Sequence, residues 1–365
     1  MSLREPVFYG EYLMLNKLLD TQYPKSAAEG AECHDETLFI IVHQVYELWF
    51  KQIIHEFSSV VKIFSQDKIE EREMHTVISR LERVIKIQSI LLEQLSVMET
   101  MTPMDFLEFR DLLVPASGFQ SVQFREVEVR MGLATKKRTG VDRDYFLGRL
   151  APADKEKILQ IEKEPSLFDL VEKWLERVPF TNKENFNFWK EFEVVVSDML
   201  DQEEKIIGMN KATLAEGLLE IQKENLKITR NTFQSLLEED LHNEQIEKGE
   251  RRLSQKATLN ALFILLYRDE PILNQPYRFL NSLMDIDQNF TTWRYRHALM
   301  AHRLLGTKIG TGGSSGHHYL KKAADNNRVY VDILNLSTFL IPRSKLPKLP
   351  KDLEKNLNFY FTESI

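Results

Sequence analysis

The residues most able to do chemistry in this chain are two histidines in apolar surroundings, His43 and His297. His43 lies in residues 39–51, a run without Gly or Pro that is too rich in apolar residues for a surface helix. The density of apolar residues in this run predicts a helix that passes through the core. Phe39 lies four residues before His43, so the two rings share a helix face. A histidine buried among aromatic rings needs a hydrogen bond, a metal or a reacting ligand, and the run itself leaves a core role and a functional role open.

His297 ends the stretch Trp293-Arg294-Tyr295-Arg296-His297, on a helix with further apolar residues. A single histidine on an apolar helix is able to bind haem iron through its neutral imidazole, although a core histidine remains the alternative. The chain has no Cys-x-x-Cys-His, which excludes a covalently attached c-type haem. A di-iron site is disfavoured, because no second helix pairs a Glu with a His three residues on.

Arg110 is the cationic candidate, since it shares a predicted helix face with Phe106 and Leu113 and precedes Ser117. A guanidinium among apolar residues needs a carboxylate, which an internal Asp or Glu or a bound substrate would supply equally well. Residues 310–316 form a glycine-rich loop whose amides, with the Thr311 hydroxyl, could gather around an anion. The loop lacks a Walker ending, so a connection that closes over a ligand fits better than a nucleotide site.

Composition limits the classes of function. The chain has 365 residues, a net charge of −7 and no dense basic tract, which argues against nucleic acid as a partner. No apolar run is long enough to span a membrane, and the N-terminus lacks a signal-peptide pattern. Cys33 is the only cysteine, which excludes an internal disulfide and a thiolate metal cluster. We therefore expect a cytoplasmic protein.

The elements that must position these residues are helical. Few glycines and prolines and a 3.6-residue periodicity predict an all-α fold, a helical bundle that forms one domain over 1–365 with a small helical insertion near 135–185. The predicted helices cover 36–65, 77–98, 103–113, 119–130, 166–176, 185–237 with a break near 208, 258–267, 277–284, 291–305, 319–322 and 329–340. The mixed-charge run 238–252 predicts an exposed turn. Segment 1–20 is amphipathic without a core of its own, so it must dock on another surface.

Several long motifs occur along the chain. They are Tyr-Gly-x-Tyr-Leu at 9–13, Phe-Ile-Ile-x-His-Gln-x-Tyr-Glu-Leu-Trp-Phe-Lys-Gln at 39–52, Phe-Arg-Asp-x-Leu-x-Pro-Ala-Ser-Gly-Phe-Gln-Ser at 109–121, Trp-Arg-x-x-His at 293–297, Gly-Thr-Gly-Gly-Ser-Ser-Gly at 310–316 and Leu-Asn-Leu-Ser-Thr-Phe-Leu-Ile-Pro-Arg at 334–343. Taken together, these motifs resemble one family, tryptophan 2,3-dioxygenase. The resemblance spans both ends of the chain and is loose over 130–250. It implies a bundle enclosing haem b (iron protoporphyrin IX), which reacts L-tryptophan with O₂ to give N-formyl-L-kynurenine, the first step of the kynurenine pathway.

The resemblance also implies roles for single residues. His297 corresponds to the proximal iron ligand and His43 to the distal histidine that meets the indole N–H. Phe39 corresponds to the phenylalanine that packs on the indole. Arg110 corresponds to the arginine that binds the substrate carboxylate, and Thr311 to a threonine near its ammonium and carboxylate groups.

Other positions correspond to pocket walls and to subunit contacts. Phe106, Leu113 and Ser117 match residues that line the pocket. Tyr9, Tyr12 and Leu13 match residues that reach a neighbouring subunit's pocket in a homotetramer built as a dimer of dimers. The competing interpretations are a related haem oxygenase for a modified indole or another aromatic amino acid, and a haem sensor or silent helical scaffold.

Overall fold

The computed structural model describes residues 6–133, 147–148, 150–179, 181–183, 186–209, 216–308 and 316–358. In this part of the chain the fold is all-α, as the sequence predicts, apart from one hairpin of two strands with two residues each. Two compact units are present, Met1–His55 with Lys86–Glu164 and Gln288–Arg328, and Glu56–Ile85 with Pro165–Asp287 and Val329–Ile365. The single-domain description stays a prediction.

Three long helices contribute residues to both units. They are α4 (His34–Phe64), α5 (Glu71–Met98) and α15 (Pro271–Leu305). The first unit adds α1 (Tyr9–Tyr12), α2 (Leu15–Leu18), α3 (Lys25–Ala28), α6 (Pro103–Arg110), η1 (Asp111–Leu113), η2 (Gly118–Gln120), α7 (Val122–Met131), α9 (Pro152–Ile161) and α16 (Gly316–Asn326). Within this unit α7 packs against α9. Helix α6 begins where the sequence predicts, because Thr102 and Asp105 form a reciprocal capping box around Pro103.

The N-terminal segment is fastened to α4 by a buried carboxylate. Glu36 is 1% exposed, and its two oxygens accept hydrogen bonds from the backbone amides of Lys25 (2.7 Å) and Ser26 (2.8 Å). These amides open α3 and would otherwise lack partners within the helix. The Ser26 hydroxyl in turn accepts a bond from the Cys33 amide at 2.9 Å. Beyond this attachment, α1 and α2 bury none of their residues.

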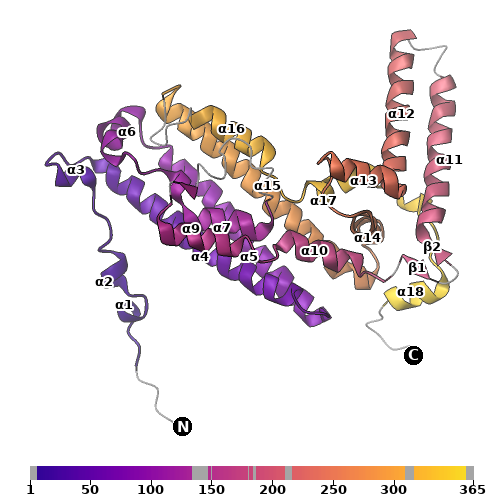
Figure 1. The fold of residues 1–365 in the computed structure, drawn as a ribbon, viewed down its shortest axis with the longest axis horizontal. Coiled ribbons are helices and arrows are strands. Elements are labelled where there is room, and N and C mark those ends of the chain that lie inside the picture. The colour runs from indigo at the N-terminus through magenta and orange to yellow at the C-terminus, as the bar shows by residue number, and fades with distance from the viewer. Residues whose placement is uncertain are drawn as a thin grey trace. The chain divides into compact units, whose positions relative to one another are not determined.

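The second unit is built around α14 (Gln255–Leu266), a helix with eight buried residues. It contacts α10 (Leu167–Glu176), α12 (Glu216–Leu237), α13 (Glu239–Glu247), α17 (Val331–Asn335) and η5 (Leu336–Phe339). Helix α11 (Phe188–Met209) lies beside α12 (Figure 1). The unit also contains β1 (Asn182–Lys183), β2 (Phe186–Asn187), η6 (Arg343–Lys345) and α18 (Lys351–Leu357). The strands pair antiparallel, with Asn182 opposite Asn187.

The prediction of an exposed turn over 238–252 is wrong, because α13 occupies most of it. One side chain of this charged helix, His242, is fully buried. Its Nε2–H donates to the Leu253 carbonyl at 2.9 Å, and its Nδ1 accepts from the Arg251 guanidinium at 2.9 Å. In the sequence, the charged residues around His242 give no sign that its side chain is buried. Its two hydrogen bonds anchor the helix.

Helix α15 is continuous where the sequence predicts two helices, 277–284 and 291–305. Asp287, a polar residue between these ranges, has its partners inside the fold. The Asp287 carboxylate accepts hydrogen bonds from the amides of Val329 (3.0 Å) and Tyr330 (3.2 Å).

Among the described residues, no helix is long and apolar enough to cross a membrane.

Candidate functional site

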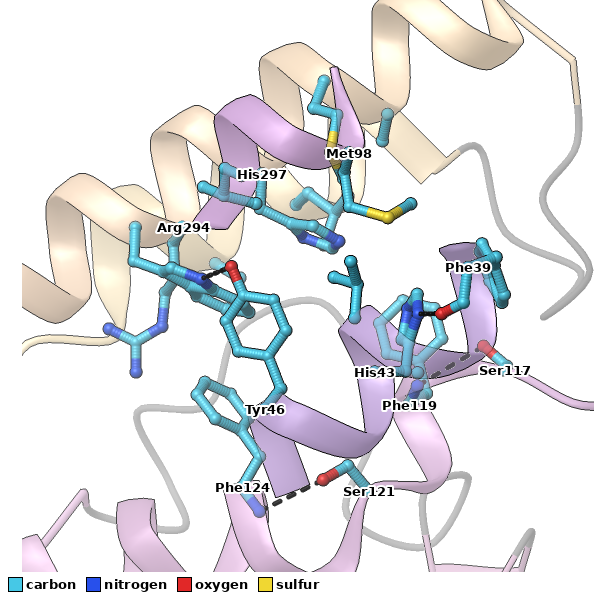
Figure 2. Close-up of a pocket in the computed structure, with 18 of the residues that line it drawn as sticks. Phe39, His43, Tyr46, Met98, Ser117, Phe119, Ser121, Phe124, Arg294 and His297 are labelled. Carbon is cyan, nitrogen blue, oxygen red and sulfur yellow. Dashed lines mark hydrogen bonds between the residues drawn. The ribbon is translucent and has the colours of Figure 1, made fainter. Parts of the chain in front are cut away.

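The first unit contains a cavity of about 300 Å³ that side chains of α4, α5, α6, η2, α7, α15 and α16 line. Figure 2 shows His43 and Phe39 of α4 on one side and His297 on the other, with Met98 beside them. Most of the lining is apolar. The aliphatic and thioether side chains of this lining are Val42, Leu95, Met98, Met300, Ala301, Leu304, Leu305, Leu320 and Ala323.

His43 is held by its own helix. Its Nδ1 lies 2.7 Å from the carbonyl oxygen of Phe39, one turn earlier, and its ring centroid lies 4.1 Å from that of Phe39. A carbonyl only accepts, so Nδ1 carries the proton and the neutral ring keeps a lone pair on Nε2. Burial lowers the pKa of His43, and the Phe39 carbonyl and the Glu47 charge offset this only in part. The imidazole is therefore neutral near pH 7, with Nε2 as an acceptor.

An aromatic wall joins α4 to α6. The ring of Phe39 stacks on Phe106 at a centroid distance of 5.8 Å and meets the edge of Phe109 at 5.6 Å. Both α6 rings are buried. Arg110, the last residue of α6, lines the same cavity. The capped start of α6 thus fixes the register that brings a cation next to an aromatic wall.

The 117–124 segment closes another part of the cavity. Ser117 begins η2 and its hydroxyl accepts a bond from the Phe119 amide at 3.4 Å. Ser121 caps α7 and donates at 2.6 Å to the carboxylate of Glu47 on α4. Gln123 donates to the other oxygen of that carboxylate at 2.8 Å. These bonds attach the segment to the helix that carries His43.

His297 projects from α15 and is half-buried at the cavity. Burial lowers its pKa to about 4, and the nearby His43 acts in the same direction. Its ring lies parallel to the indole of Trp293, with centroids 5.1 Å apart and an angle of 5° between the planes. Within the described residues, no hydrogen bond is assigned to either ring nitrogen of His297. At physiological pH the ring is therefore neutral, and one of its nitrogens has a lone pair available to bind a metal ion.

A buried carboxylate on α7 completes the charged part of the lining. Glu128 binds Arg294 of α15 at 2.8 Å and also forms a short ion pair with Arg125. The Arg294 guanidinium donates to the Asn327 carbonyl at 2.7 Å as well. Sequence reasoning included Arg294 in a motif but missed Glu128, because nothing in the sequence links two residues 166 positions apart.

The structure brings six of the predicted residues to one cavity. They are Phe39, His43, Phe106, Arg110, Ser117 and His297. Leu113, in η1, is not among the described residues that line it. Tyr9, Tyr12 and Leu13 lie outside it and are 76%, 74% and 39% exposed. Thr311 and most of the glycine-rich loop lie outside the described residues.

Three residues with contacts at the cavity were missed as site residues, although each lies in or next to a quoted motif. Tyr46, Glu47 and Trp293 line the cavity, and their partners lie on other helices. Among the described residues, no three His, Cys, Asp or Glu side chains gather into a cluster able to hold a metal ion. Among the described residues that line the cavity, the imidazoles are those of His43 and His297.

Comparison with known proteins gives consistent matches along the chain. A family profile described as tryptophan 2,3-dioxygenase matches residues 3–340. A tryptophan 2,3-dioxygenase of Bdellovibrio bacteriovorus is 47% identical over 356 residues, which cover 98% of this chain and 99% of the relative. One of Alteromonas mediterranea is 45% identical over 356 residues, 98% of each chain. Tryptophan 2,3-dioxygenase B of Danio rerio is 44% identical over 352 residues, 96% of this chain and 86% of the relative.

Proposed function

Since this chain belongs to the tryptophan 2,3-dioxygenase family, we propose that it inserts both atoms of O₂ across the indole C2–C3 bond of L-tryptophan. The product is N-formyl-L-kynurenine, and the reaction is the first step of tryptophan catabolism by the kynurenine pathway. The observation that carries the proposal is that His297 of α15, His43 of α4 and Arg110 of α6 line the same cavity. These three side chains supply an iron ligand, an acceptor for an indole N–H and a cation for a carboxylate.

We assign haem b to this cavity as cofactor. His297 would bind the haem iron, because its lowered pKa keeps the imidazole neutral and, within the described residues, its ring nitrogens make no hydrogen bond. The aliphatic and thioether lining named above suits the apolar faces of a porphyrin. When bound, haem iron supplies the activation of O₂ that a closed-shell organic substrate requires.

Arg110 would bind the carboxylate of tryptophan. A guanidinium binds a carboxylate through two parallel hydrogen bonds, and such a charge-assisted pair contributes about 1.5–3 kcal/mol, or about ten- to hundred-fold in affinity. Phe39 would pack on the indole, as part of the wall it forms with Phe106. A free amino acid with an aromatic side chain fits this combination.

His43 would orient the indole through its Nε2 atom. The bond from Nδ1 to the Phe39 carbonyl leaves Nε2 as an acceptor, which matches the donor character of an indole N–H. Proton removal from indole by a neutral imidazole is strongly uphill, since a general base works best when the two pKa values match. His43 therefore acts as a hydrogen-bond partner that aligns the ring, and the apolar surroundings exclude water from the reacting carbons.

The remaining predicted residues keep proposed roles of lesser weight. Phe106, Leu113 and Ser117 would line the substrate end of the cavity, and Thr311 would lie near the substrate ammonium and carboxylate. Tyr9, Tyr12 and Leu13 would pack against a neighbouring subunit of a homotetramer, a dimer of dimers. Their large exposure supports this, because exposed aromatic residues clustered on one segment are typical of interaction surfaces. A cytoplasmic location is proposed on the single cysteine.

Two measurements on the purified protein test the function. We expect a Soret band after reconstitution with haemin, and an absorbance rise from N-formylkynurenine when the reduced protein meets tryptophan in air. Tryptophan should be consumed and indole without the amino-acid group should react far more slowly, because Arg110 then has no carboxylate to bind. A haem-loaded protein that converts a modified indole but leaves tryptophan intact would contradict the proposal. Light scattering that gives the mass of a monomer would contradict the tetramer.

A further inference from the structure

We propose that Trp293 and Tyr46 set the ring orientation of His297. The indole of Trp293 stacks on the His297 imidazole and is itself held by residues of two other helices, so the indole fixes the plane of the imidazole. The inference rests on the proposed function, in which His297 binds haem iron. Both residues line the cavity. They would be positioning residues, acting on the iron through His297.

The stack follows from the spacing on α15. Trp293 and His297 are four residues apart, so an α-helix places them on one face. Their ring planes differ by 5° and their centroids lie 5.1 Å apart, within the range of an offset stack. Rotation of the imidazole about its Cβ–Cγ bond would tilt its edge into the indole face. The flat indole therefore restricts the direction of the His297 lone pair.

The indole itself is held by Tyr46. The Trp293 Nε1–H donates to the Tyr46 hydroxyl oxygen at 3.3 Å, and this hydroxyl donates to the Leu91 carbonyl at 2.6 Å. The dashed line from the Tyr46 hydroxyl in Figure 2 marks the first bond. Burial raises the pKa of Tyr46 to about 12, so the hydroxyl keeps its proton and makes both bonds at once. The chain of contacts runs from the α5 backbone through α4 to the indole.

Aromatic packing holds the indole from other directions. The Tyr46 ring meets the Trp293 indole at 65° with a centroid distance of 6.0 Å, and the Phe124 ring of α7 lies 5.2 Å from it. An axial histidine is usually oriented by a hydrogen bond from its second nitrogen. Within the described residues His297 has no assigned bond of that kind, and the contact on its ring is the Trp293 stack. Stacking here takes the place of the usual hydrogen bond.

The test compares three variants with two matched controls. Trp293→Leu removes the stacked ring, Trp293→Phe keeps a ring without the N–H, and Tyr46→Phe removes the hydroxyl alone. Tyr295→Phe removes a hydroxyl on the same helix that donates to Asp325 of α16 and has no bond to His297 or Trp293, and Trp189→Phe removes an indole from α11 in the second unit. Each full-length protein is loaded with haemin, reduced without O₂ or tryptophan, and measured by resonance Raman spectroscopy for its iron–histidine stretching band. Haem transfer to excess apomyoglobin gives the rate of haem loss.

We expect the iron–histidine band to shift and broaden in Trp293→Leu, to change less in Tyr46→Phe and to recover in part in Trp293→Phe. Haem loss from Trp293→Leu should be about 2- to 12-fold faster, the factor that corresponds to one aromatic pair. Both controls should match the wild-type protein. A role in folding alone would lower the melting temperature and leave the band of the haem-loaded fraction in place.

Three outcomes would overturn the inference in distinguishable ways. An unshifted band in a folded, haem-loaded Trp293→Leu protein refutes the orienting role while the proposed function stands. If Trp293→Leu does not fold, an unshifted band in Tyr46→Phe refutes it. If the wild-type protein binds no haem, both the proposed function and this inference are overturned. The same holds if the iron–histidine band is still present in the His297→Ala variant.

Discussion

The buried ion pair next to the cavity makes an asymmetric prediction about stability. Glu128 serves two arginines, Arg125 and Arg294, whereas Arg294 has a second partner in the Asn327 carbonyl. We compare Glu128→Gln, which keeps the shape of the side chain and removes its charge, with Arg294→Met, which keeps much of its apolar volume. Because the carboxylate is shared, its loss should destabilise the protein more than the loss of one of its partners.

The magnitudes follow from burial. The side chains of Glu128 and Arg294 are 3% and 9% exposed and lie 2.8 Å apart. Breaking a buried pair by removing one charge costs about 3–5 kcal/mol, and Glu128→Gln takes the neutralising carboxylate from two guanidinium groups at once. In Arg294→Met, Glu128 keeps its pair with Arg125. The cost is then about 1–3 kcal/mol, the value for leaving the Asn327 carbonyl without this donor.

The assay is urea unfolding, followed by tryptophan fluorescence and analysed for the free energy of unfolding. The matched control is Glu220→Gln, which breaks the Glu220–Lys223 pair at the same 2.8 Å separation, but between side chains that are 65% and 54% exposed. That variant should lose less than about 1 kcal/mol. Equal losses for Glu128→Gln and Glu220→Gln, or a larger loss for Arg294→Met than for Glu128→Gln, would refute the reasoning.

Three further predictions concern single residues. Arg110→Ala should raise the KM for tryptophan about ten- to hundred-fold, because it removes the cation that binds the tryptophan carboxylate. The haem spectrum should stay unchanged, so the measurement is steady-state kinetics together with an absorption spectrum of each batch. His297→Ala should lose its haem on gel filtration, and normal haem loading would contradict the ligand assignment. His242 is buried and neutral, and burial lowers its pKa. The unfolded chain therefore binds the extra proton more readily, so this stabilising contribution is complete above pH of about 6.5 and is lost as the pH falls below it. Urea midpoints at pH of about 7.5 and 5 should differ more for the wild type than for His242→Leu, and equal differences would count against the burial argument.

Local signals in the sequence predicted the helices. They did not predict which residues distant in the sequence form contacts with one another. The start of α6 is readable because Thr102, Pro103 and Asp105 lie within four positions. His43 and Phe39 are also local, since one helical turn joins them. The bond between Tyr46 and Trp293 spans 247 positions, so neither residue could be assigned a partner in advance.

Two errors in the fold have the same origin. His242 was hidden in a charged run because its partners, Arg251 and Leu253, lie beyond the end of its helix. The gap between the predicted helices 277–284 and 291–305 does not occur, and the amides that satisfy Asp287 within it come from 42 and 43 positions away. Composition indicates where polar residues occur, whereas tertiary contacts decide whether they are buried.

Two side chains of α4 limit how far the N-terminal segment reaches. Glu36 holds the amides of Lys25 and Ser26, and Gln44 donates to the Thr21 carbonyl at 3.0 Å, so Tyr9 is tethered to α4 by 12 residues, from 9 to 21. A fully extended tether of that length spans at most about 40–43 Å, and the helical turns in α1 and α2 shorten it. Any surface that receives the Tyr9 side chain must therefore lie inside that radius of Thr21.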